Sequence, residues 1–155
     1  MVLVNDVLEA VAVICSKALP EVKDVMTERV QLADEPQVSI EIISFDQELL
    51  DHAGVRKTLV LNIIYLSEGN TVGQALLAAE RLTAALLPGL WVGSRHLTPS
   101  AAPNTTLVEQ DLHFRYQLSW HDDLVDLTYN PESGALEERK RPADNDKLMS
   151  ELNLS

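Results

Sequence analysis

The side chains best suited to chemistry in this chain are its four histidines and one local group of carboxylates. The segment His121-Asp122-Asp123, with Asp126 beyond it, gathers carboxylate oxygens, which are the ligands that divalent cations prefer. The alternating ligands and central glycine of a calcium-binding loop are missing, so a solvated turn is the favoured interpretation. The histidines are widely separated, and none has a zinc-binding spacing. We therefore expect no metal and no other cofactor.

Sequence motifs for nucleophilic catalysis and for phosphate binding are also missing. No serine lies in a GxSxG elbow. The glycines of Gly69-Asn70-Thr71-Val72-Gly73 precede an expected helix, but the lysine of a phosphate-binding loop does not follow. The single cysteine, Cys15, lies in an apolar helical pattern and is expected to be buried. The sequence predicts that the protein is not an enzyme, and an enzyme built on Asp122, Asp123 and Asp126 is the weakest alternative.

Composition narrows the class of partner. The formal net charge is −12, which argues against binding nucleic acid or anionic lipid through a basic patch. The only basic run, Arg139-Lys140-Arg141, follows Glu137-Glu138, so its charge is largely neutralised by its neighbours. No apolar run approaches the ~20 residues of a membrane span, and the N-terminus lacks the features of a signal peptide. We expect synthesis in the cytoplasm, no membrane association and protein partners.

Hydrophobic periodicity predicts an α/β (α+β) fold with an antiparallel or mixed sheet flanked by helices. A domain over residues 1–128 is expected to precede a charged C-terminal arm over residues 129–155, which lacks a period and is predicted to be extended or mobile. The expected elements are a helix capped by Asp6 and ending near Leu19-Pro20, a strand within Val25–Leu32, a strand through Val38, Ile40 and Ile42, a central strand over Lys57–Leu66, a helix over Thr71–Leu87 and a long strand over Leu107–Trp120.

Two of these elements have apolar residues on more than one side. The strand Lys57–Leu66 carries apolar side chains on both faces, which is typical of a central strand. The helix Thr71–Leu87 is apolar nearly all round, and such a helix is buried on several sides. In a chain of 155 residues the additional cover can come from another subunit. The segment Leu90–Thr106 is expected to be irregular, with a short strand near Arg95–Thr98.

Charged side chains mark the ends of a polar link over Phe45–Val55, which is expected to protrude as a loop. Asp46 and Glu48 enter this link, and Arg56-Lys57 leave it, so the charges can pair within the subunit or across an interface. A second group of interface candidates lies near the C-terminus, where Leu148, Met149 and Leu152 have the spacing of one helical face.

Taken in order, these elements resemble the tail terminator family of tailed bacteriophages and related contractile phage-like particles. The resemblance covers most of the chain, although Leu90–Thr106 is longer than the corresponding segment of the family. It rests on a helix opening near Val4-Asn5-Asp6, a strand reaching Ile43-Ser44 before Gln47, Gly54 and Arg56-Lys57 leading into Leu61-Asn62-Ile63-Ile64-Tyr65, a further helix, Leu112-His113-Phe114-Arg115-Tyr116, and a charged tail ending in Lys147-Leu148-Met149-Ser150-Glu151-Leu152.

The resemblance implies a small α/β protein that forms a hexameric ring on the finished tail tube and ends its polymerisation. It implies as partners the tail tube protein and a sheath or head-completion protein, and a location in the tail of a phage or prophage-derived particle made in the host cytoplasm. The alternative is a non-enzymatic adaptor or small-ligand-binding α/β domain that acts as a monomer or dimer.

Overall fold

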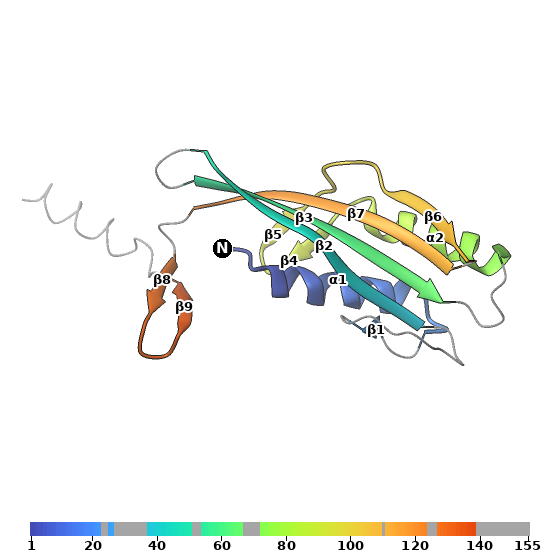
Figure 1. The fold of residues 1–155 in the computed structure, drawn as a ribbon, viewed down its shortest axis with the longest axis horizontal. Coiled ribbons are helices and arrows are strands. Elements are labelled where there is room, and N and C mark those ends of the chain that lie inside the picture. The colour runs from blue at the N-terminus through green and yellow to red at the C-terminus, as the bar shows by residue number, and fades with distance from the viewer. Residues whose placement is uncertain are drawn as a thin grey trace, which may run out of the picture.

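A computed structural model of the chain describes residues 1–22, 25–26, 37–50, 54–66, 72–109, 111–123 and 127–138 (Figure 1). Two helices and nine strands are described within these ranges. In chain order they are α1 (Val4–Ala18), β1 (Val25–Met26), β2 (Gln37–Leu49), β3 (Gly54–Leu66), α2 (Val72–Leu86), β4 (Leu90–Val92), β5 (Arg95–Leu97), β6 (Asn104–Val108), β7 (Asp111–Asp123), β8 (Leu127–Asn130) and β9 (Ala135–Glu138).

The main sheet has the strand order β1-β2-β3-β7-β6. Its neighbours are antiparallel except β1, which runs parallel to β2, so the sheet is mixed. Figure 1 shows β2, β3 and β7 running along the length of the molecule, with the β2–β3 hairpin extending past the start of α1 at one end. The β4–β5 and β8–β9 pairs form two small separate sheets. The predicted α+β class and the central place of Lys57–Leu66 are confirmed.

The core lies between one face of the main sheet and the two helices. Leu59, Leu61 and Ile63 of β3 are fully buried there, together with Phe114 and Tyr116 of β7. The opposing helix residues are Val7, Val11 and Cys15 of α1 and Ala75, Ala78, Leu82 and Leu86 of α2. Cys15 is fully buried, which confirms its predicted role as a buried apolar side chain, and this burial raises the pKa of its thiol to about 12.

The link expected over Phe45–Val55 is wrong in its extent. β2 continues to Leu49 and β3 begins at Gly54, so regular cross-strand pairing reaches almost to the end of the hairpin. The segment is polar because one face of this part of the hairpin is exposed to solvent. A strand with an exposed face can carry charged side chains, which is the feature that suggested a loop. A register shift between Ile42 and Ser44 also breaks the predicted alternation, and it leaves Ile42 49% exposed.

The strand predicted over Leu107–Trp120 is interrupted at Glu109. This residue has a positive φ of 52° and separates β6 from β7, which then pair with each other antiparallel. Val108, predicted to face the core, is 50% exposed on β6. The alternation in the sequence was correct for β7, where even-numbered residues from Leu112 to Trp120 are buried.

Three further expectations need correction. Leu3 and not Asp6 is the N-cap residue of α1, and the carbonyl of Leu3 accepts the first helical hydrogen bonds while Asp6 lies in the first turn. The segment Leu90–Thr106 is more regular than expected, because Leu90–Val92 forms β4 and pairs with β5, whereas the short strand predicted near Arg95–Thr98 is confirmed as β5. The arm predicted to lack structure pairs as β8 and β9 over its first part. Most of Val25–Leu32, and all of the arm beyond Glu138, lie outside the described residues.

Candidate interaction surfaces

The four charged candidates on the β2–β3 hairpin lie on its two opposite faces. Glu48 pairs across the strands with Arg56, at 3.9 Å between Oε2 and Nη1, and both side chains are more than half exposed. Asp46 is exposed on the same face, opposite Thr58. An exposed ion pair of this kind contributes little to stability, so these three residues remain available for contact with another molecule.

Lys57 projects from the other face and is only 5% exposed. Its Nζ donates a hydrogen bond of 2.9 Å to Oδ2 of Asp122 on β7 and a longer one, of 3.4 Å, to the carbonyl of Val2. The sequence groups Lys57 with Arg56, but the alternation of a strand places adjacent side chains on opposite faces. Lys57 therefore supports the base of the hairpin from inside the subunit.

Asp122 is the centre of a buried polar cluster. Its carboxylate accepts hydrogen bonds from the Trp120 indole at 3.1 Å and from the Val2 backbone N–H at 3.2 Å, as well as from Arg95 and Lys57. Arg95 also donates to the carbonyl of His121 at 2.8 Å. One carboxylate thus ties together the N-terminal segment, β3, β5 and β7 at the base of the hairpin.

The electrostatics of this cluster favour an ionised Asp122. Burial alone would raise the pKa of its carboxyl, but the hydrogen bonds from Lys57 and Val2 and the charge of Lys57 outweigh burial and lower it below its usual value. A carboxylate held by the buried Lys57 and the partly exposed Arg95 is not available to a metal ion, so Asp122 is removed from the predicted acidic group. Asp126 lies outside the described residues, within which no group of three potential metal ligands occurs.

The described part of the hairpin carries exposed apolar residues where β2 ends. Leu49 is 70% exposed and Leu50 is 42% exposed, and on the same strand Ile43 is 46% exposed. The backbone N–H of Leu50 donates to the carbonyl of Gly54 at 3.0 Å, which closes the described part of the hairpin. We call Leu49 and Leu50 the hairpin tip. Exposed leucines at this position are available for contact with another molecule.

A second apolar surface is a groove between α2 and the edge strand β6, with a volume of about 590 Å³. We call it the α2 groove. Leu76 and Leu87, each about half exposed, line it together with Ala79, Glu80, Thr83, Ala84, Pro88 and Thr105. The prediction that this helix has more apolar surface than one subunit covers is confirmed, because Val72 and Leu77 are exposed as well.

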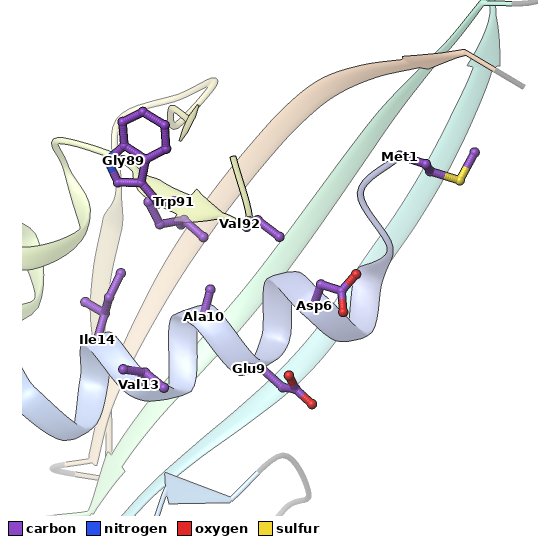
Figure 2. A pocket seen from close by; sticks show the side chains of 11 residues that line it. Met1, Asp6, Glu9, Ala10, Val13, Ile14, Gly89, Trp91 and Val92 are labelled. Carbon is purple, nitrogen blue, oxygen red and sulfur yellow. The ribbon is translucent and has the colours of Figure 1, made fainter. Parts of the chain in front are cut away.

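A third surface, the Trp91 hollow, has a volume of about 650 Å³ and lies between α1 and β4 (Figure 2). Figure 2 shows Val13 and Ile14 of α1 at the same end of the hollow as Trp91, with Asp6 and Glu9 toward its other end. Trp91 is 65% exposed, and the centre of its ring lies 4.9 Å from the centre of the His96 ring. Sequence analysis missed this surface because Trp91 lies in the segment expected to be irregular.

The remaining candidates of the sequence analysis, Leu148, Met149 and Leu152, lie outside the described residues. Among the helices that are described, none has both the length and the apolar character to cross a bilayer.

Comparison with known proteins includes a distant structural likeness. No protein-family model matches the chain, and no curated protein matches it. A solved structure described as the virion of a native gene transfer agent particle contains a similar chain, with 17% identity and a TM-score of 0.41. The similarity covers 72% of this chain and 93% of that one. At this identity and TM-score the likeness assigns neither a family nor a function.

Proposed function

We propose that the protein is a structural component of a phage-like particle and caps the tail tube as a hexameric ring. In this role it ends tube polymerisation and provides the joining surface for the head or neck. The proposal starts from the resemblance of the sequence to the tail terminator family. The order of the described elements is in keeping with it: α1, a long β2–β3 hairpin, α2 and the long strand β7 follow one another as that resemblance requires.

The observation that carries the ring is the presence of two unlike apolar surfaces on one subunit. The hairpin tip lies beside the Asp123 end of β7, because Gly54 pairs with Asp123. The α2 groove includes Thr105, which pairs with Phe114 nine residues away along β7. At ~3.3 Å per residue the two surfaces are about 30 Å apart. A ring closed by one repeated head-to-tail contact needs two such different patches on each subunit.

The chemistry of the two surfaces is complementary. The hairpin tip presents leucine side chains, and the α2 groove is lined mainly by leucine, alanine and proline. Arg56 is exposed near the hairpin tip, while the groove contains the acidic Glu80. We therefore propose that the hairpin of one subunit contacts the groove of the next, with Asp46, Glu48 and Arg56 at the rim and Lys57 fixing the hairpin from within.

The two faces of such a ring would meet different partners. One would contact the tail tube protein, and the other a head-completion or sheath protein. The C-terminal arm with Leu148, Met149 and Leu152 is an additional candidate for these contacts. Within the particle the protein would lie at the head-proximal end of the tail.

Electron microscopy of particles made with and without the protein tests this function. Without it, tails should be longer than normal and variable in length and should lack heads, because nothing stops tube growth. A matched pair of variants refines the test: Leu76→Asp in the α2 groove should give the same defect, whereas Ser16→Asp, at an exposed site on α1 outside the groove and the Trp91 hollow, should not. Tails of normal length without the protein would overturn the proposal.

The alternative, a monomeric or dimeric adaptor or ligand-binding domain, draws on the Trp91 hollow, whose volume lies within the range of small-molecule sites. Mass measurement in solution and on purified tail tubes separates the two functions. A protein that stays monomeric or dimeric even on tube ends favours the adaptor.

A further inference from the structure

We propose that the Trp91 hollow is the docking site for the C-terminal segment of the same chain, residues 139–154. In this arrangement Arg139-Lys140-Arg141 lies against Asp6 and Glu9, and the apolar residues Leu148, Met149, Leu152 and Leu154 cover the end of the hollow near Trp91. The inference does not depend on ring formation.

The first observation is that the hollow exposes side chains that proteins normally cover. Trp91 is 65% exposed and Val13 53% exposed, and they lie at the same end of the hollow in Figure 2. Gly89, directly before β4, has a φ of 93° that other residues rarely adopt, so the turn that leads to Trp91 depends on glycine. An exposed tryptophan beside aliphatic side chains is the typical centre of a protein contact.

The second observation is charge complementarity. Asp6 and Glu9 are exposed on α1 at the end of the hollow away from Trp91, and no ion pair within the described ranges involves either of them. The chain carries a net charge of −12, yet it places three consecutive basic residues directly after Glu138. These residues are the only basic run of three in the sequence, and although neighbouring carboxylates neutralise the run at long range, its side chains can pair in direct contact with the acidic end of the hollow.

The third observation is that the arm begins close enough to reach the hollow. The Val2 N–H lies 3.2 Å from Asp122, so the Met1 end of the hollow is beside the last residues of β7. Glu138 pairs with Leu127, which follows Asp123 by four residues, and this limits its distance from Asp123 to about 20 Å. Figure 1 shows β8 and β9 at the same end of the molecule as the N-terminus.

The order of residues along the arm also agrees with the order along the hollow. The basic residues come first in the arm. They would meet the acidic end of the hollow, since that end is nearer to the Asp123 end of β7, from which the chain continues toward the arm. Residues 139–147 can span at most ~30 Å, and α1 rises only about 12 Å between Asp6 and Ile14. Leu148 and Met149 can therefore reach Val13 and Trp91 without strain. Because the arm is tethered, its effective concentration at the hollow is high, and a short segment suffices for binding.

Tryptophan fluorescence of the full chain reports the docking directly. The protein has two tryptophans, and only Trp91 is exposed, since Trp120 is 4% exposed. The double variant Leu148→Asp/Met149→Asp should shift the emission to longer wavelength and increase quenching by iodide. The same two substitutions in a Trp91→Phe background should produce no change. An unchanged emission in the first variant, or an equal change in the second, would overturn the proposal.

Charge reversal supplies an independent test with a built-in control. Asp6→Lys/Glu9→Lys should undock the arm and reproduce the red shift, and so should reversal of residues 139–141 to glutamate. Combining both reversals should restore the wild-type emission, whereas Glu80→Lys, in the α2 groove and outside the lining of the hollow, should leave it unchanged. Thermal melting of each variant verifies that the fold is intact. Failure of the combined variant to restore the emission would overturn the proposed pairing.

Dilution distinguishes the arm of the same chain from that of a neighbouring subunit. An intramolecular contact gives an emission spectrum that does not change with protein concentration. A red shift on dilution would assign the hollow to the arm of a second copy and would overturn the proposal in its present form.

Discussion

Lys57 Nζ lies 2.9 Å from Oδ2 of Asp122, and both residues are buried at the base of the β2–β3 hairpin. The neighbouring residue, Arg56, forms its ion pair with Glu48 at 3.9 Å on the exposed face. One pair therefore holds strands together inside the subunit, and the other lies free on its surface. The two pairs differ in burial although their cations are adjacent in the sequence.

This difference predicts opposite outcomes for two adjacent substitutions. Lys57→Met leaves the Asp122 carboxylate buried with less compensation, and breaking such a pair costs about 3–5 kcal/mol. Arg56→Met removes an exposed pair and should change the free energy of unfolding by less than about 0.5 kcal/mol. Urea unfolding of both variants checks the prediction. A similar loss in the two would mean that Lys57 is not buried as described.

Protonation of Asp122 should make the protein less stable in acid. Because its pKa is lowered in the folded state, the stabilisation it provides is fully present above its unfolded pKa, whose reference value is 3.8. This stabilisation is lost as the pH falls from the unfolded pKa through the lower folded pKa. In that range the unfolded chain binds a proton at Asp122 while the folded protein does not. Asp122→Asn should therefore be less stable than wild type at neutral pH, and its unfolding free energy should fall less steeply below pH ~4. If the unfolding free energies of Asp122→Asn and of the wild type fall equally steeply with pH, Asp122 is not the origin of the acid sensitivity.

Two glycines should respond in opposite directions to the same substitution. An added Cβ at Gly89 would overlap the carbonyl oxygen of Leu97, and its φ of 93° is unfavourable for alanine, so Gly89→Ala should destabilise by more than about 1 kcal/mol. Gly73 lies in α2 with open space around it, so Gly73→Ala should stabilise by about 0.5–1 kcal/mol. Thermal melting measures both. Equal effects would contradict the description of the turn before β4.

The parts of the fold that the sequence predicts well are those dictated by local burial. Ile63 and Leu61 lie in an apolar run that only a central strand accommodates, and both are fully buried in β3. The excess apolar surface of α2 is likewise a local property, and Leu76 and Leu87 remain exposed. In each case the side chains themselves determine the environment that the segment requires.

The errors arise where contacts distant in sequence decide the outcome. Strand alternation places Lys57 on the face of Leu59 and Leu61, but a lysine there can be buried only because Asp122, 65 residues later, pairs with it. The break at Glu109 is not marked by glycine, proline or asparagine, so the alternation of Leu107–Trp120 continues through a turn. Trp91 was missed because β4 and β5 are each too short to show a period.

The proposed head-to-tail contact makes a specific prediction for mixtures of two defective subunits. A Leu49→Asp/Leu50→Asp variant loses the hairpin tip but keeps the α2 groove, while Leu76→Asp loses the groove and keeps the tip. Neither variant should form rings by itself, whether free at a concentration at which the wild type does or on purified tail tubes.

When the two variants are mixed in equal amounts, one intact contact is possible, between the tip of the second variant and the groove of the first. Association should therefore stop at a pair, because both remaining patches are defective. Native mass spectrometry of the mixture measures this directly. If the contact were instead symmetric, tip against tip, it would close as a dimer, so the groove variant would form that dimer by itself and the hairpin variant would stay monomeric. That result would exclude the tip-to-groove contact and the head-to-tail ring built on it.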